Sequence, residues 1–150
     1  MIDSNLLALT GFKLAIHSEN FKHTQYFAVS ASFPAVSLPE VTTSFRNLSG
    51  FVPGDKLTYD PLTVRIAIDE RLESYNEVFN WMYLNTKNKE LINYDMTLHF
   101  LTNHNNISRS VRFANAFPTN MGGLEFNVQQ TESEYAYVDV TFRYDYFEFM

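Results

Sequence analysis

The sequence predicts a mainly β fold, an antiparallel β-sandwich or partly open barrel with one α-helix outside it. Several runs place apolar side chains at every second position, the pattern of strands with one buried and one wetted face. Only residues 71–84 follow the helical period, and no strands alternate with helices as in a parallel βαβ sheet. Aromatic residues make up 16% of the chain, a composition that favours strands. We therefore expect about seven or eight antiparallel strands.

The size and charge of the chain limit its function further. Its 150 residues suit a single domain, 1–150, with one hydrophobic core. The net charge of −6 and the absence of a Lys/Arg cluster argue against binding to nucleic acid through a basic patch. The chain has no cysteine, so disulfides and thiolate metal sites are excluded. The first residues do not resemble a signal peptide, and no apolar run could span a membrane, so we expect a cytoplasmic protein with no membrane partner.

The first two predicted strands are residues 12–16 and 26–33, which we expect to form a hairpin. Both alternate apolar and polar side chains, and the stretch between them, residues 18–24, is mostly polar. Pro34 and Pro39 follow, and proline cannot donate to a sheet ladder. The chain is therefore expected to leave the sheet there.

Residues 42–58 predict an extended arm. Two short strands, 41–47 and 51–58, are expected to reverse at residues 48–50. An isolated hairpin is marginal in water, so its apolar side chains need a partner surface. We predict a subunit interface formed by Phe45, Arg46, Leu48, Phe51, Val52 and Leu57. The alternative is an arm folded back on its own core.

The middle of the chain predicts a strand, a helix and two more strands. Residues 62–68 alternate clearly, and residues 71–84 then follow helical spacing with glutamates in the early turns, where carboxylates suit the positive helix end. We expect this helix to lie across the sheet. Residues 95–102 and 110–117 predict two strands separated by an Asn-rich turn.

The carboxy-terminal region has the strongest alternation. Residues 136–146 predict one strand, and residues 124–128 predict its antiparallel partner after a Gly122-Gly123 turn.

No residues form a recognisable catalytic or cofactor motif. The sequence contains no phosphate-binding loop, nucleophile elbow or zinc-binding histidine pattern, so we expect no enzyme activity, no metal and no cofactor. The late carboxylates leave open a small glycosidase. Trp81 and the tyrosines leave open a monomeric carbohydrate-binding module, although core packing is the simpler explanation for them. The acids could also line an aqueous channel and repel DNA, with Glu125, Asp139 and Asp145 as the candidate lumen-facing residues.

Three segments resemble a known family, the tail tube proteins of contractile-tailed bacteriophages and of related injection machines. The most specific segment is FPTNMGGLEFNVQQTESEYAYVDVTFRYDYFEF at the carboxy terminus. The other two are VSASFPAVSLPEV and GDKLTYDPLTVRIAIDERLESYNEVFNWM. Together they span residues 29–149.

The resemblance implies a structural virion protein without catalytic residues. It implies six-subunit rings whose pooled strands complete an inner barrel, stacked into a tube that conducts double-stranded DNA. The implied partners are further copies of the chain, a sheath protein outside, and baseplate and tail-terminator proteins at the ends. Residues 42–58 would grip neighbouring subunits, and assembly would occur in the host cytoplasm. The repeated tube subunit is the main expectation, and an initiator or terminator ring of the same fold is the alternative.

Overall fold

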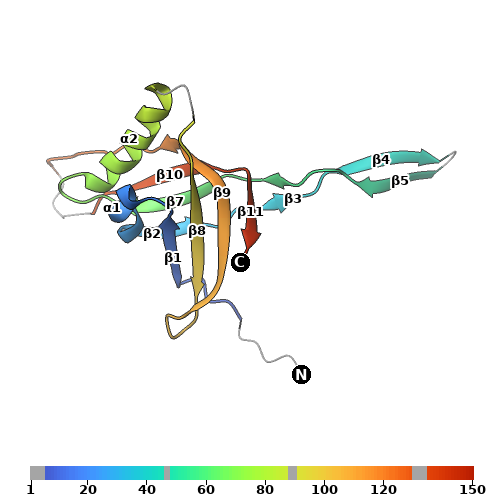
Figure 1. Cartoon of the computed structure of the whole chain (residues 1–150), viewed down its shortest axis with the longest axis horizontal. Helices are drawn as coiled ribbons and strands as arrows, with labels where there is room; N and C mark the ends of the chain where they lie inside the picture. The colour runs from blue at the N-terminus through green and yellow to red at the C-terminus, as the bar shows by residue number, and fades with distance from the viewer. Residues whose placement is uncertain (1–5, 46–47, 88–90, 130–134) are drawn as a thin grey trace.

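The computed structural model describes residues 6–45, 48–87, 91–129 and 135–150. It confirms a mainly β, antiparallel fold with one principal helix on the outside (Figure 1). The described strands are β1 (Phe12–Ile16), β2 (Ala28–Ser32), β3 (Val36–Ser37), β4 (Glu40–Phe45), β5 (Leu48–Pro53), β6 (Thr58–Tyr59), β7 (Leu62–Ala67), β8 (Tyr94–Leu101), β9 (Ile107–Met121), β10 (Tyr137–Arg143) and β11 (Tyr146–Phe149). The helices are the 3-10 turn η1 (Glu19–Phe21), α1 (Lys22–Tyr26) and α2 (Glu73–Lys87).

Two sheets share the long strand β9. Sheet A consists of β1, β8, the first half of β9, and β11. Sheet B consists of the second half of β9 with β10, β7 and β2. The strands of sheet B run across those of sheet A, as Figure 1 shows. Among the described residues the strand path runs open from β1 to β2, so the subunit alone closes no barrel.

The hydrophobic core lies between the two sheets and is covered at one end by α2. The alternation predicted for residues 62–68 is confirmed, because every second side chain of β7 is buried. Residues 95–102 do form a strand, β8, but its buried side chains are three in a row, Met96, Thr97 and Leu98. The core members include Leu14, Met96, Val111 and Phe113 from sheet A, Leu62, Val64, Val140 and Phe142 from sheet B, and Val78 and Trp81 from α2. Trp81 is only 2% exposed, and its Nε1 donates to the Ile92 carbonyl at 2.8 Å. It is therefore a core residue, as core packing predicted, and no carbohydrate platform.

The predicted hairpin of residues 12–16 and 26–33 is wrong. β1 pairs with β8, and β2 pairs with β7 at the far edge of the other sheet. The segment between them forms η1 and α1 because Phe21, 4% exposed, enters the core. The Phe21 ring packs on Trp81 at 4.8 Å and on Tyr94 at 5.5 Å between centroids, which a loop between paired strands could not achieve. The prediction of a single helix missed these two short elements.

The principal helix is displaced from its predicted range. α2 runs over Glu73–Lys87 rather than 71–84. Leu72 has a φ of 57°, outside the helical region, so it cannot belong to the helix. The Asp69 carboxylate then accepts from the Ser74 backbone N–H at 3.3 Å, which satisfies one of the free donors at the helix start.

The predicted pairing of residues 124–128 with 136–146 is also wrong. Both edges of β10 are occupied already, since Val140 lies opposite Val64 of β7 and opposite Met121 of β9. Residues 124–128 therefore form no strand, and Phe126 and Val128 are exposed. The expected single strand 136–146 divides into β10 and β11, and both pair with β9. The division lies beside Asn115, which has a φ of 55°.

Candidate assembly interface

The arm is held firmly where it leaves the two sheets. Phe33, the residue after β2, packs against Phe147 with ring centroids 5.2 Å apart, and Tyr59 of β6 packs against the same ring at 5.1 Å. The Tyr144 hydroxyl donates to the Asp60 carbonyl at 2.7 Å. Burial, and then the nearby charge of Asp60, raise the pKa of Tyr144 to about 12, so the hydroxyl stays protonated and able to donate. We call this group of contacts, formed by Phe33, Tyr59, Tyr144 and Phe147, the aromatic clamp.

A close backbone crossing joins the root of the arm to its tip. The arm consists of the short pair β3–β6 followed by the hairpin β4–β5. Between these pairs, the Gly54 N–H donates to the Pro39 carbonyl at 2.6 Å. A Cβ on Gly54 would lie 2.6 Å from that oxygen, so only glycine permits this approach.

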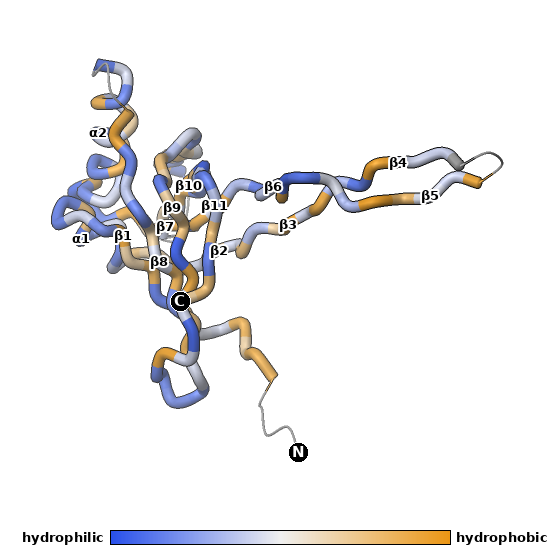
Figure 2. The backbone as a smooth tube through the Cα atoms, turned by 45° about the vertical axis from the view of Figure 1, so that its right-hand side comes forward, coloured by the Kyte–Doolittle hydropathy of each residue, from blue (hydrophilic) through white to orange (hydrophobic). Residues whose placement is uncertain are grey.

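The tip of the arm exposes apolar side chains on both faces. Residues directly opposite each other in an antiparallel pair share a face, which places Val41 with Val52 and Phe51 with Thr42. Phe51 is 66% exposed and Leu48 is 77% exposed. In Figures 1 and 2 the arm projects far from the two sheets, with hydrophobic stretches on both strands. It does not fold back on its own core, so that alternative is excluded.

Four of the six predicted interface residues are exposed side chains of this arm. Leu48, Phe51 and Val52 lie on β5, and Leu57 precedes β6; all are exposed. Phe45 ends β4, and Arg46 lies outside the described residues. The predicted reversal at residues 48–50 is wrong, because these residues belong to β5 and Leu48 pairs with Phe45. Their role in subunit contacts stays a prediction.

An apolar recess, which sequence reasoning missed, opens beside β1. It has a volume of about 480 Å³ and is lined by Leu7, Leu9, Phe12, Phe33, Phe100 and Phe149, among others. Leu9 is 92% exposed at its rim. An apolar surface of this kind, like the arm, is typical of an interface between subunits.

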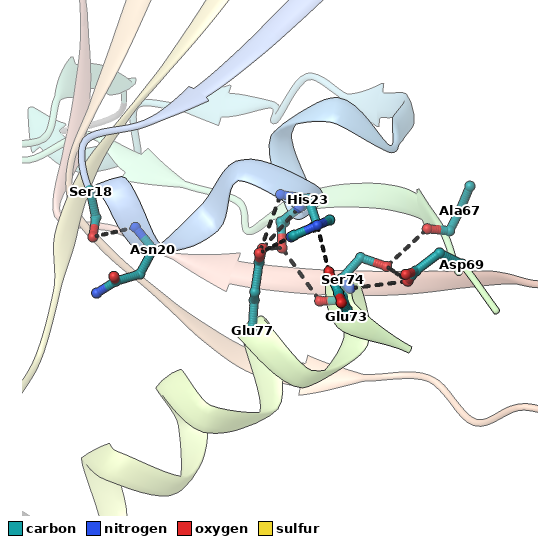
Figure 3. A network of polar contacts seen from close by, with 9 residues as sticks. Ser18, Asn20, His23, Ala67, Asp69, Glu73, Ser74 and Glu77 are labelled. Carbon is teal, nitrogen blue, oxygen red and sulfur yellow. Dashed lines mark hydrogen bonds and ion pairs between the residues drawn. The ribbon is translucent and has the colours of Figure 1, made fainter. Parts of the chain in front are cut away.

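A network of polar contacts fixes α1 on α2 (Figure 3). One Glu77 carboxylate oxygen accepts from the Thr24 hydroxyl at 2.7 Å and the Thr24 N–H at 2.9 Å. The other lies 2.7 Å from His23 Nδ1, and His23 Nε2 lies 2.5 Å from Glu73. The hydrogen bond to Glu77, against an opposing effect of burial, raises the pKa of His23, and the charges of Glu73, Glu77 and Asp69 add to this. Ser18 caps η1, and it is the sequence signal that could have revealed these turns.

The three candidate lumen acids lie in different surroundings. Asp139 on β10 pairs with Arg65 at 3.0 Å. Asp145, between β10 and β11, accepts from Asn115 Nδ2 at 2.7 Å. Glu125 lies in the irregular segment after β9. The structure therefore does not collect them on one strand, and their role in a lumen stays a prediction.

The described residues contain no cluster of three or more His, Asp or Glu side chains that could hold a metal ion. Nor does this part of the chain include a helix with the length and hydropathy needed to cross a bilayer.

Comparison with known proteins identifies the family. The chain is 30% identical over 152 aligned positions to the tail tube terminator protein of Enterobacteria phage T4, and the alignment covers 93% of this chain and 86% of that protein. The chain belongs to the family of the T4 tail tube terminator. No family model matches it. This relative is a structural tail component, which agrees with the expected class of protein.

Solved structures of other contractile machines contain the same fold. One similar chain comes from the cryo-EM structure of the tube terminating cap of the anti-feeding prophage. It has a TM-score of 0.77 at 16% identity, and the match covers 100% of this chain and 94% of that one. A chain in the sheath-tube complex of the PVC extracellular contractile injection system has a TM-score of 0.74 at 16% identity, covering 97% and 91%. Since a cap and a sheath-tube complex both contain the fold, the fold alone does not separate a terminator from a repeated tube subunit.

Proposed function

We propose that this chain forms a ring that ends the tail tube of a contractile-tailed phage. The observation that carries the proposal is the 30% identity to the T4 terminator along 93% of the chain. It favours the alternative expectation, a terminator or initiator ring, over the repeated tube subunit. The ring has six subunits, contacts the last ring of the tube and the surrounding sheath, and lets double-stranded DNA pass without specific binding. It belongs to the virion and assembles in the host cytoplasm.

The exposed arm supports self-association. Burying a Phe or Leu side chain stabilises a complex by roughly 1.5–3 kcal/mol per residue, and the arm presents several such side chains beyond the reach of its own core. The aromatic clamp fixes the direction of the arm, which lowers the entropy lost when the arm binds. A structural role in an oligomer therefore accounts for surface that a monomeric binding module would not need.

Negative-stain electron microscopy and native mass spectrometry of the purified chain test this function. A terminator gives discrete six-subunit rings. Raising the protein concentration gives more rings, but each particle stays one ring long along its axis. Tubes of open-ended length would instead assign the chain to the repeated tube. A protein that stays monomeric, and does not bind tube ends purified from the same phage, would refute the proposed function.

A further inference from the structure

One face of the arm carries three exposed aliphatic side chains. The register of the hairpin places Val41, Leu48 and Val52 on the same side, since paired residues share a face and side chains alternate along each strand. Their exposed fractions are 50%, 77% and 43%. Gly50 lies between Leu48 and Val52 and has no side chain, so Leu48 projects alone near the tip of this face.

The recess beside β1 is an apolar hollow of a size that suits such side chains. Its volume of about 480 Å³ falls in the range of roughly 300–1,000 Å³ that holds ligands in other proteins. Among the described residues that line it, Arg109 alone is charged. The guanidinium of Arg109 already lies over the Phe149 ring, 4.9 Å from its centroid.

The arm and the recess also match in charge. The described residues of the hairpin from Val41 to Pro53 include no charged side chain. Burying a charge without a partner is the main electrostatic cost of an interface, and a contact between this arm and the recess brings no second charge into the hollow. Apolar contact is therefore what the two surfaces offer each other.

The arm of one subunit points away from the recess of the same subunit. In Figure 1 the hairpin β4–β5 extends away from the sheets, whereas the recess lies beside β1, next to the amino-terminal segment. The hairpin reaches about 20 Å beyond the crossing of Gly54 and Pro39, at about 3.3 Å for each of the six residues of β4. Its tip can therefore meet the recess of a second copy.

Phe33 connects the recess to the root of the arm. Its ring lines the recess and also packs against Phe147 in the aromatic clamp, at 5.2 Å. Phe33 is still 42% exposed in the single subunit. A side chain that fills the recess covers Phe33 and so holds the clamp that directs the subunit's own arm. Each docked arm then favours the docking of the next.

We propose that Leu48 of one subunit enters the recess of its neighbour in the same ring. The contact joins two different surfaces, and contacts of this kind either close into a ring or continue as an open filament. Because the proposed terminator ring is finite, the contact closes, and each arm and each recess is used within the ring. This inference rests on the proposed function.

The absence of cysteine from the chain makes a direct test possible. Leu48→Cys and Leu9→Cys in one chain place a thiol near the tip of the arm and another at the rim of the recess. Rings are treated with a short bis-maleimide cross-linker and separated by size under denaturing conditions. We expect a ladder of covalent oligomers that ends at six subunits. Leu48→Cys with Asn76→Cys, on the exposed side of α2, is the control and should give no ladder.

A charge swap provides a second measurement if the thiols prevent ring formation. We expect Leu48→Lys and Leu9→Asp each to weaken association at least tenfold in sedimentation velocity. The double variant should regain most of this loss, because the new charges attract each other across the contact.

Three results overturn this inference alone and leave the terminator function standing. They are intact rings without a ladder, a ladder that passes six subunits, and a double variant that associates no better than Leu48→Lys. Failure of the unsubstituted chain to form rings, alone or on tube ends, overturns the proposed function and the inference together.

Discussion

Single side chains tie the elements together, and His23 is the one whose contribution depends on pH. Both of its ring nitrogens face carboxylates, Glu77 at 2.7 Å and Glu73 at 2.5 Å. Two donors on one imidazole require the protonated ring. The raised pKa of His23 in the folded protein means that folding takes up a proton as the pH passes this range.

We expect His23→Gln to reduce the stability of the chain at low pH and to change it little at high pH. The stabilisation by His23 is fully present below its ordinary pKa of 6.5 and is lost as the pH rises through the higher pKa of the folded state. The measurement is the thermal midpoint of both proteins from pH 5.5 to pH 9, and their difference isolates His23 from other titrating groups. His104→Gln, in an exposed turn, is the control. A difference independent of pH would contradict the prediction.

Tyr144 tests the aromatic clamp at the level of one hydroxyl. Tyr144→Phe keeps the ring contacts and removes the hydrogen bond to the Asp60 carbonyl, so we expect a loss of about 1 kcal/mol in the free energy of unfolding. Urea denaturation measures it. Tyr146→Phe removes a hydroxyl from an exposed ring on β11 and should cost less. Equal losses in the two variants would show that the hydrogen bond to Asp60 stabilises the fold no more than the hydroxyl of an exposed tyrosine does.

At the scale of elements, the arm separates folding from assembly. Phe51→Asp places a charge where the proposed ring buries an apolar ring, so we expect the subunit to associate at least tenfold more weakly, a change of about 1.4 kcal/mol or more. The thermal midpoint of the monomer should change little, because Phe51 is 66% exposed.

Ser49→Asp is the matched control for charge, because Ser49 lies two residues away on the same face of β5. Sedimentation velocity measures association for all three proteins. Normal association of Phe51→Asp would remove this part of the arm from the interface, and equal losses in both variants would assign the effect to charge rather than to lost burial.

The crossing of Gly54 and Pro39 controls the arm as a whole. Gly54→Ala forces a Cβ to within 2.6 Å of the Pro39 carbonyl, so the two segments must separate. We expect the hairpin to lose its fixed direction and the ring to form poorly, while the core between the sheets stays folded. Gly123→Ala, where a Cβ meets nothing within 4 Å, is the control. Limited proteolysis of the arm, together with sedimentation velocity, measures both effects. Intact association of Gly54→Ala would contradict the prediction.

At the scale of the whole molecule, sequence reasoning succeeded where the signal is local. The alternation in residues 62–68 and 95–102 is a property of one strand with one buried face, and both strands are present. The exposed apolar arm followed from residues 42–58 alone. The pairing of strands, in contrast, depends on residues that are far apart in the sequence. For example, Lys13 of β1 lies opposite His99 of β8. The assumption that neighbours in sequence form a hairpin therefore failed twice, at residues 12–33 and at residues 124–146.

The candidate site was predictable only in part, for the same reason. The three acids were grouped because they follow each other in the chain, but Asp139 and Asp145 are bonded to Arg65 and Asn115 on different strands. The apolar recess beside β1 is lined by side chains from distant strands, so it arises from strand order, which no short segment encodes.

Assembly should appear in the thermodynamics of the whole molecule. Anything that binds only the folded state raises the apparent stability by mass action, so we expect the thermal midpoint of the unsubstituted chain to rise with protein concentration. The midpoint of Phe51→Asp should rise less. Differential scanning calorimetry over a hundredfold range of concentration measures this. A constant midpoint in a protein that sediments as a monomer would contradict it.

The shared strand β9 has a mechanical consequence. It passes from one sheet to the other as a single run of 15 residues, so a load on one sheet reaches the other through covalent backbone as well as through side-chain contacts. Layers joined only by packing can slide past each other, whereas layers joined by one continuous chain must deform together. A ring of such subunits would resist radial pressure from within as one stiff wall.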